Sequence, residues 1–309
     1  MNFGQRNYNT LRTFAQFKKA RFYLVFIALS PIKVREVLGD SMAYKECDYI
    51  SPNYIEREFY FAGNYGAKGE KRAEREKITP LQVAKNNQWN RVKRLRRTLQ
   101  LNFFPVDYWI TVKYKAGTRK DIKDVKSDVK KFLDGLRKKY KARGQPLMFV
   151  YRIEIGKRGG LHCHMVINRI QDGDLLMRDA WKKATDDAGS IDYTTIEETG
   201  GFGGLAEYIC KLPDEEITGQ MKFDIPDTDK KKLIAISSSR NLKRPCPVVK
   251  KRSHWTMRRL LMGEIKPTEG FMIDKDSVRQ GVNRFTGLSY LYYTEVRIDQ
   301  LARGDTWIT

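Results

Sequence analysis

The sequence is poor in the residues that hold most metal and disulfide sites. It has three histidines and four cysteines in 309 residues. No C-x-x-C pair or disulfide-like spacing is present, which indicates reduced thiols in a cytosolic protein. A G-x-x-x-x-G-K-[ST] loop is also missing, so no fused helicase is evident. The cysteines are Cys47, Cys163, Cys210 and Cys246.

Long apolar runs are missing as well. The only strongly apolar run is FYLVFIALS at 22–30, far shorter than the roughly 20 residues of a membrane-spanning helix. Basic residues precede it, so a secretory signal peptide is an alternative, but no A-x-A-like cleavage site follows and Pro31 comes at once. We expect a buried strand or short core helix here, in a cytoplasmic protein without a membrane partner.

Acidic residues are heavily outnumbered. Lys and Arg total 59 against 37 Asp and Glu, which gives a formal net charge of +22. The usual partner of such a surplus is a phosphate polymer, whereas an anionic membrane would normally be met by a basic amphipathic helix. The 41% of apolar residues suits a folded chain, and its length allows two domains or one large domain with additions.

Soft boundaries near 100 and 215 divide the chain into three parts: a basic N-terminal extension at 1–100, a core at 101–215 and a basic C-terminal extension at 216–309. In the first part, apolar residues from about 80 recur close to a 3.6-residue period and predict a helix, with Gln88 as a polar break. In the third part, 231–245 resembles a strand entering a basic loop, and 250–261 resembles a basic helix.

The core has the clearest pattern. The order β-α-β-β-α-β, followed by a helix, predicts an α+β fold of the ferredoxin-like, split βαβ type, with an antiparallel sheet and helices on one face. Its expected elements are strands at 106–114, 146–155, 161–168 and 190–197, and helices at 121–144, 174–187 and 205–212.

Two of the three histidines stand together in the stretch GKRGGLHCHMVIN at 156–168. His162 and His164 share one face of the predicted strand, about 7 Å apart, and can reach one metal ion from the same side. The alternative is a pair of polar residues on a half-exposed strand, because short motifs often occur by chance.

The hairpin geometry supplies a third ligand. Folding GKRGG about Arg158 makes Glu154 oppose His162 and Arg152 oppose His164, with cross-strand partners about 5 Å apart at Cβ. The carboxylate then lies on the histidine face, although a plain cross-strand ion pair remains open. Two imidazoles and one carboxylate leave open positions on an octahedral ion, which favours Mg²⁺ or Mn²⁺ holding a phosphate.

A tyrosine follows on the predicted helix LAEYICKL. Tyr208 and Lys211 are three residues apart and so lie on one helix face. Beside a metal-bound phosphate the hydroxyl can attack phosphorus, and the ammonium can hold the phosphate or lower the pKa of the tyrosine. Alternatively, Tyr208 is a core aromatic residue and Lys211 is solvated.

The motifs WITVKY, RGGLHCHMVIN and YICK, in this order, resemble the HUH endonucleases. More narrowly, they resemble the rolling-circle replication initiators of phages and plasmids, including the filamentous-phage gene II type. The resemblance covers 106–212 and implies that His162 and His164 bind the divalent ion, that Tyr208 is the nucleophile and that Lys211 accompanies it. Glu154 rests on the hairpin geometry, because the third ligand of the family varies. The stretch SSSRNLKRP at 237–245 is similar to a Ser-Arg loop of some phage initiators.

The resemblance implies a metal-dependent, origin-specific DNA nickase and ligase. Tyr208 would form a 5′-phosphotyrosine and release a 3′-OH for a host polymerase, with a host helicase opening the duplex in the host cytoplasm. Relaxases and single-tyrosine transposases share this chemistry and remain alternatives. So does a non-enzymatic nucleic-acid-binding protein with an RRM-like sheet, in which Trp109 and Tyr151 would stack on bases.

Basic residues beyond the histidine site are expected to contact DNA phosphates. His254 has no spacing that matches a metal site and is expected to be structural or to contact DNA. The residues expected to contact DNA are Arg91, Lys93, Arg94, Arg96, Arg97, Arg158, Arg240, Lys243, Lys250, Lys251 and Arg252.

Overall fold

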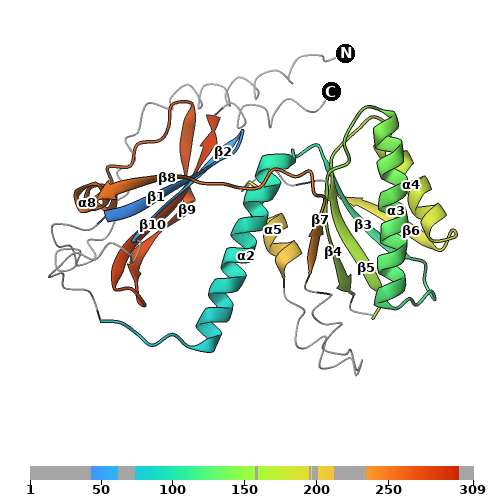
Figure 1. Cartoon of the computed structure of the whole chain (residues 1–309), viewed down its shortest axis with the longest axis horizontal. Coiled ribbons are helices and arrows are strands. Elements are labelled where there is room, and N and C mark those ends of the chain that lie inside the picture. Colours follow the sequence, from blue (N-terminus) through green and yellow to red (C-terminus); the bar gives the residue numbers. More distant parts are fainter. Residues whose placement is uncertain are drawn as a thin grey trace, which may run out of the picture. The chain divides into compact units, whose positions relative to one another are not determined.

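A computed structural model describes residues 43–61, 74–156, 159–194, 196, 201–211, 233 and 235–298. It divides into two compact units, one of Ile78–Cys246 and one of Met1–Lys77 with Pro247–Thr309. Figure 1 gives the elements of both, and each unit is described by itself. The apolar run at 22–30, expected to be buried, lies outside the described residues.

The unit Ile78–Cys246 contains a five-stranded antiparallel sheet in the order β6-β3-β5-β4-β7. The first four strands of the chain order have the spatial order 4-1-3-2, and helices follow the first and third of them, so the predicted α+β ferredoxin-like fold is confirmed. The strands are β3 (Tyr108–Tyr114), β4 (Phe149–Ile155), β5 (Leu161–Ile167), β6 (Gly189–Thr194) and β7 (Ile236–Ser238).

Helices cover both faces of this sheet, not one face as predicted (Figure 1). Ile110, Cys163 and Met165 pack against α3 (Ile122–Ala142) and α4 (Gly173–Ala184). Alternate residues such as Trp109 and Val166 pack instead against α2 (Pro80–Asn102) and α5 (Gly203–Cys210). The near-continuous apolar strands β3 and β5 account for this, because a strand that is apolar on both faces must be covered on both.

The helix predicted from about 80 is α2, and it begins at a capping box in which Thr79 and Gln82 bond each other's backbone N–H groups. From Val92 onwards its apolar residues are buried in the same cluster as α5, which places the helix in the unit of the sheet. The unit therefore begins at Ile78 and ends at Cys246, whereas the sequence pattern indicated boundaries near 100 and 215.

The other unit contains a second five-stranded antiparallel sheet, in the order β8-β1-β2-β10-β9. Tyr44, Phe59, Leu291 and Tyr293 build its core together with Met257 of α8. Its elements are β1 (Ala43–Ile50), β2 (Tyr54–Phe61), β8 (Val248–Ser253), α8 (His254–Leu261), β9 (Phe271–Asn283) and β10 (Leu288–Arg297).

The basic helix predicted at 250–261 is wrong at its start. Residues 250–253 belong to β8, and the helix begins only at His254. The reason is the pairing of β8 with β1, in which Lys250 lies opposite Glu46. Strand pairing with a buried acidic partner therefore overrides the local helical pattern. None of the described helices is both long and apolar enough to cross a membrane.

Candidate metal and tyrosine site

The hairpin of β4 and β5 has the predicted register. Glu154 pairs with His162 and Arg152 with His164. The Gly156 N–H donates to the Gly160 carbonyl at 2.8 Å, and Gly159 has a left-handed φ of 76° that favours glycine. The register and the hairpin closure together fix which side chains share the face of the two histidines.

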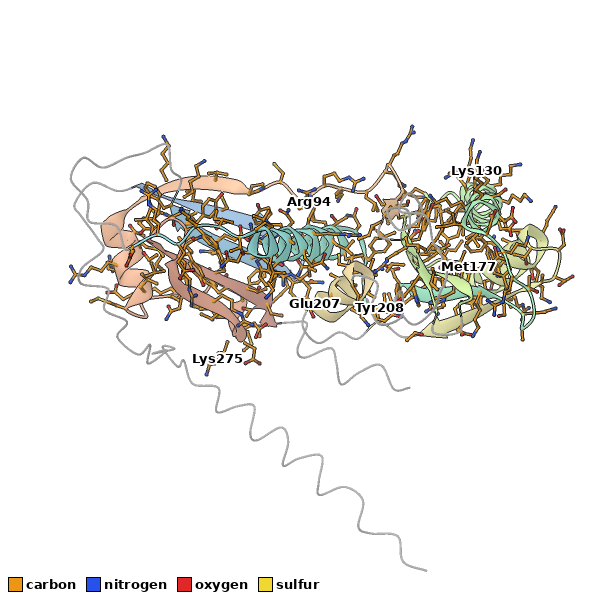
Figure 2. All side chains as sticks on the ribbon, turned by 90° about the horizontal axis from the view of Figure 1, so that it is seen from below. Arg94, Lys130, Met177, Glu207, Tyr208 and Lys275 are labelled. Carbon is orange, nitrogen blue, oxygen red and sulfur yellow. The ribbon has the colours of Figure 1, made fainter. Side chains whose placement is uncertain are left out.

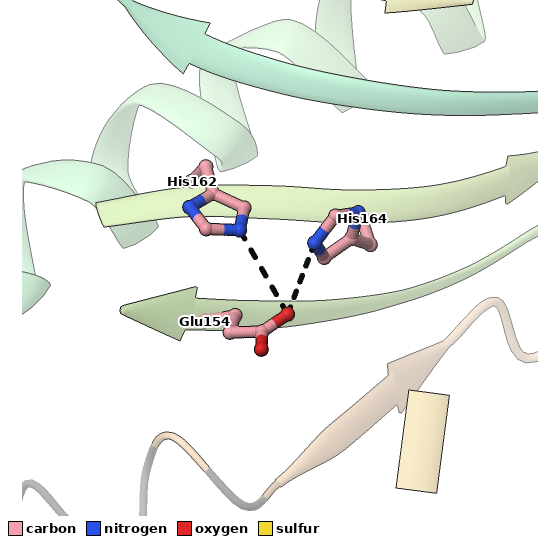
Figure 3. A group of neighbouring side chains, drawn as sticks. All are labelled: Glu154, His162 and His164. Carbon is pink, nitrogen blue, oxygen red and sulfur yellow. Dashed lines mark ion pairs between the residues drawn. The ribbon is translucent and has the colours of Figure 1, made fainter. Parts of the chain in front are cut away.

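The three predicted ligands converge on one point (Figure 3). Glu154 Oε2 lies 3.0 Å from His164 Nε2 and 3.8 Å from His162 Nε2. One donor atom from each residue falls within 4.8 Å of the others. Two imidazole nitrogens and a carboxylate oxygen are ligands that first-row and magnesium-like divalent ions accept, so this group could bind a metal ion.

The electrostatics keep the carboxylate in its ligand form. Hydrogen bonds from His162 and His164 hold the pKa of Glu154 well below its usual range, outweighing the opposing effect of burial. A carboxylate that stays ionised at neutral pH offers lone pairs to a cation without first losing a proton.

His164 is held from two further sides. Thr111 Oγ1 lies 2.9 Å from Nδ1, and the Trp109 ring stacks on the imidazole at 5.5 Å and 16°. The side chain is only 9% exposed. Because Nδ1 is bonded to the hydroxyl, Nε2 is the nitrogen that faces Glu154, which is how a metal-binding histidine is normally oriented.

Tyr208 on α5 reaches the same imidazole. Its Oη lies 3.1 Å from His164 Nε2, and its ring meets that of Trp109 edge-on at 5.9 Å. The residue is 46% exposed, so its hydroxyl is accessible (Figure 2). Burial and the Glu154 carboxylate raise the pKa of Tyr208, while the charges of Lys211 and Arg152 act to lower it. The predicted nucleophile and the predicted ligands thus form one cluster.

Side chains beneath the site fix the end of α5. Arg152, 3% exposed, donates its Nε to the Leu233 carbonyl at 3.0 Å and its Nη1 to the carbonyls of Ile209, at 2.9 Å, and Lys211. Gln88 donates to the Cys210 carbonyl at 2.5 Å. These donors satisfy carbonyls that a helix end leaves without intrahelical partners. The polar break in the α2 pattern therefore anchors the tyrosine helix.

The structure separates the residues expected to contact DNA. Arg94 is exposed on α2, whereas Arg97 of the same helix is 7% exposed and is therefore not a surface phosphate contact, because its position on the helix turns it inward. On α2, Arg91, Lys93 and Arg96 are partly exposed, and Arg240 and Lys243 are exposed in the loop after β7. Arg158 and the side chain of His254 lie outside the part of the chain that is described.

The β8 residues of this set are tied to acids in their own unit. Lys250 lies 2.9 Å from Asp48, and Arg252 lies 2.5 Å from Glu46. Both acids are almost fully buried. Lys251 is exposed and has the opposite parity in the strand. Much of the charge of Lys250 and Arg252 is thus matched within the sheet, which weakens them as phosphate contacts.

Sequence reasoning missed the supports of the site. Thr111 and Trp109 reach His164 only because β3 lies beside β5 and pairs Thr111 with His164. No turn joins these two strands, so nothing local in the sequence sets that register. Arg152 was placed opposite His164, but its acceptors come from distant segments.

The RNA-stacking alternative loses its two aromatic residues. Trp109 is 9% exposed and lies against His164, so its face is not available to a base. Tyr151 packs against the core cluster beneath α3 and α4, on the other face of the sheet. The exposed aromatic pair that an RRM-like sheet requires is therefore not formed by these two residues.

Comparison with known proteins gave one match. Residues 107–213, about a third of the chain, match the family model of the replication-associated protein ORF2. The matched segment runs from the start of β3 to just beyond α5 and includes the histidine, glutamate and tyrosine residues of the site. No curated protein and no solved structure matched the chain. The match supports a role in replication initiation and, with it, an association with DNA.

Proposed function

We propose that the chain is a rolling-circle replication initiator that nicks and rejoins single-stranded DNA through a tyrosine–DNA link, with Mg²⁺ or Mn²⁺ as its cofactor. One observation carries the proposal: His164 Nε2 lies 3.0 Å from the Glu154 carboxylate and 3.1 Å from the Tyr208 hydroxyl. A nucleophile within hydrogen-bond reach of a ligand cluster is the arrangement that metal-assisted phosphoryl transfer requires.

The residues would divide the work as follows. Glu154, His162 and His164 would hold the divalent ion, which would polarise the scissile phosphate and offset the charge of Glu154. Tyr208 Oη attacks phosphorus, the bond to the 3′ oxygen breaks, and the phenol proton is balanced by the proton that the 3′-OH gains. The product is a 5′-phosphotyrosine with a free 3′-OH. The reverse transfer rejoins the strand without ATP, because the covalent link keeps the phosphodiester energy.

The supporting residues would set orientation. Thr111 and Trp109 fix the His164 ring, and Arg152 with Gln88 fixes the end of the helix that carries Tyr208. The Lys211 ammonium favours the phenolate and can hold a non-bridging phosphate oxygen. A host helicase and a host polymerase are the partners this reaction needs.

The test is capture of a covalent adduct. The full chain is incubated with Mn²⁺ and a randomised pool of single-stranded oligonucleotides, then separated on a denaturing gel. We expect a protease-sensitive protein–DNA band that disappears without Mn²⁺ and in Tyr208→Phe. Sequencing of the captured DNA gives the cleavage site.

Tyr193→Phe is the matched control. Tyr193 is also partly exposed, on β6 of the same unit, and its hydroxyl bonds the Asp174 carbonyl away from the cluster. It should form adduct like the parent chain. An adduct that survives Tyr208→Phe would move the nucleophile elsewhere, and binding without any adduct would leave a non-catalytic DNA-binding protein.

A further inference from the structure

A basic groove of about 460 Å³ opens in the unit Ile78–Cys246, between α2 and the edge strand β7. None of the comparisons assigns a role to it. It is lined by Arg91, Arg94, Leu95 and Thr98 of α2, Val150 of β4, and Ala235, Ile236, Ser238 and Arg244 in and around β7.

The groove lies on the same face of the sheet as the metal cluster. Val150, Arg152 and Glu154 alternate along β4 and therefore point to one face. Val150 lines the groove and Glu154 belongs to the cluster, so four residues of strand, about 13 Å, separate them. Arg152, which holds the tyrosine helix, lies between the two.

The lining has the composition of a nucleic-acid site. Among the described residues, three guanidinium groups line it and no carboxylate does. Arg244 Nη2 donates to the Ser238 hydroxyl at 3.3 Å, which leaves its other N–H groups for a further acceptor. Leu95, Val150 and Ile236 add an apolar surface against which a base can pack.

The loop that carries Arg244 is firmly held. The Asn102 side chain donates to the Lys243 carbonyl at 2.9 Å and accepts from the Lys243 N–H at 2.8 Å. The Ser239 N–H donates to the Phe149 carbonyl at 2.9 Å, and Leu242 is buried against α2 and the sheet. The groove wall is thus part of the packed unit, which favours binding without reordering.

We propose that this groove binds the phosphates and a base of single-stranded DNA next to the scissile phosphate, with Arg94 and Arg244 as phosphate contacts. An arginine-lined groove with an apolar floor fits a single strand, whose bases are unstacked and whose backbone tracks basic side chains. A duplex presents mainly phosphates and would leave the apolar floor unused. The assignment of the strand next to the cleavage point rests on the proposed function.

Binding is measured without divalent ions, by fluorescence anisotropy of a short labelled single-stranded oligonucleotide over a range of salt concentrations. The double variant Arg94→Gln, Arg244→Gln should bind at least about tenfold more weakly at low salt. Its salt dependence should be shallower by about 1.4 in log–log slope, at about 0.7 per phosphate contact. Unlabelled duplex should compete poorly.

Lys130→Gln and Arg137→Gln together are the matched control. Both lie exposed on α3, over the other face of the sheet, and Figure 2 shows Lys130 on α3 and Arg94 on α2. Equal losses in the two double variants, or equal competition by duplex, would overturn the groove. Because the assay contains no metal and reads no cleavage, a chain that binds through the groove but forms no adduct keeps the groove and loses the proposed nickase. A chain that forms adduct but whose groove variants bind normally loses the groove alone.

Discussion

Each unit contains a five-stranded antiparallel sheet with an arginine in it, and the two arginines have opposite surroundings. Arg57 of β2 lies 3.2 Å from Glu295, which is fully buried, and 3.9 Å from Asp48. Arg152 of β4 donates to three backbone carbonyls. Burial lowers the pKa of both, but Tyr293, Glu295 and Asp48 raise that of Arg57 above its ordinary value, whereas Arg152 stays below its own.

The comparison extends to the acids. In the sheet of β1 and β2, Glu46 and Asp48 are matched by Lys250 and Arg252. In the sheet of β4 and β5, the ion-pair partners of Glu154 among the described residues are the two imidazoles. Matched charges stabilise a sheet and leave nothing for a ligand, while a carboxylate facing neutral nitrogens presents lone pairs that a cation can use. The difference separates a structural charge network from a binding site.

Arg57→Met should have the largest effect of the four changes considered. It leaves Glu295 buried without its cation, which costs about 3–5 kcal/mol. The free energy of unfolding of this unit is read from hydrogen exchange of the β10 amides. The double variant Arg57→Met, Glu295→Gln should be more stable than the single one, because the neutral amide can still accept from the Thr268 N–H. A single variant as stable as the parent would show that the ion pair contributes nothing.

Glu154→Gln should abolish metal binding with little change in stability. Losing a charged ligand should weaken Mn²⁺ binding, measured by calorimetry, by at least about 100-fold, beyond the 10–100-fold typical of outer-shell partners. Glu46→Gln is the control from the other sheet and should keep the Mn²⁺ affinity while lowering stability by about 1–3 kcal/mol. Equal Mn²⁺ affinity in the parent chain and Glu154→Gln would remove the cluster as a metal site.

Glu46 should also give its unit a pH-dependent stability. Burial raises its pKa, but the hydrogen bond and charge of Arg252, with Lys250 and Arg57, outweigh this and lower it below its ordinary value of 4.5. A carboxyl with a depressed folded pKa stabilises above its unfolded pKa and loses that stability as the pH falls through the folded value. Hydrogen exchange of β1 amides below pH 4.5 should therefore show falling stability, by at most about 1.4 kcal/mol per pH unit for one group. In Glu46→Gln this part of the slope should be missing.

Thr111→Val should have the smallest effect. The change keeps the shape but removes the hydroxyl that bonds His164 Nδ1. Mn²⁺ affinity should fall by about tenfold, at the lower end for an outer-shell partner. Thr118→Val, in the exposed loop after β3, is the control and should bind Mn²⁺ like the parent chain. A Thr111→Val chain with the parent affinity would mean that packing alone orients the imidazole.

The sequence was informative where the determinants are local. The period of α3, the glycines of the β4–β5 hairpin and the pairing of Glu154 with His162 all depend on residues close together in the chain, and all were predicted. The pairing of β3 with β5, the role of Gln88 and the strand at 250–253 depend on partners far away in the chain. Such contacts follow from packing of the whole unit, so no local pattern announces them.

The alternation of Val150, Arg152 and Glu154 along β4 has a consequence for how this chain can change over evolution. Groove, helix anchor and ligand depend on one parity of one strand, so they are read in a frame of two residues. Substitutions at the hairpin tip leave that frame intact. A single-residue insertion within β4 would turn every one of these side chains toward α3 and α4, so the strand can drift in composition but hardly at all in length.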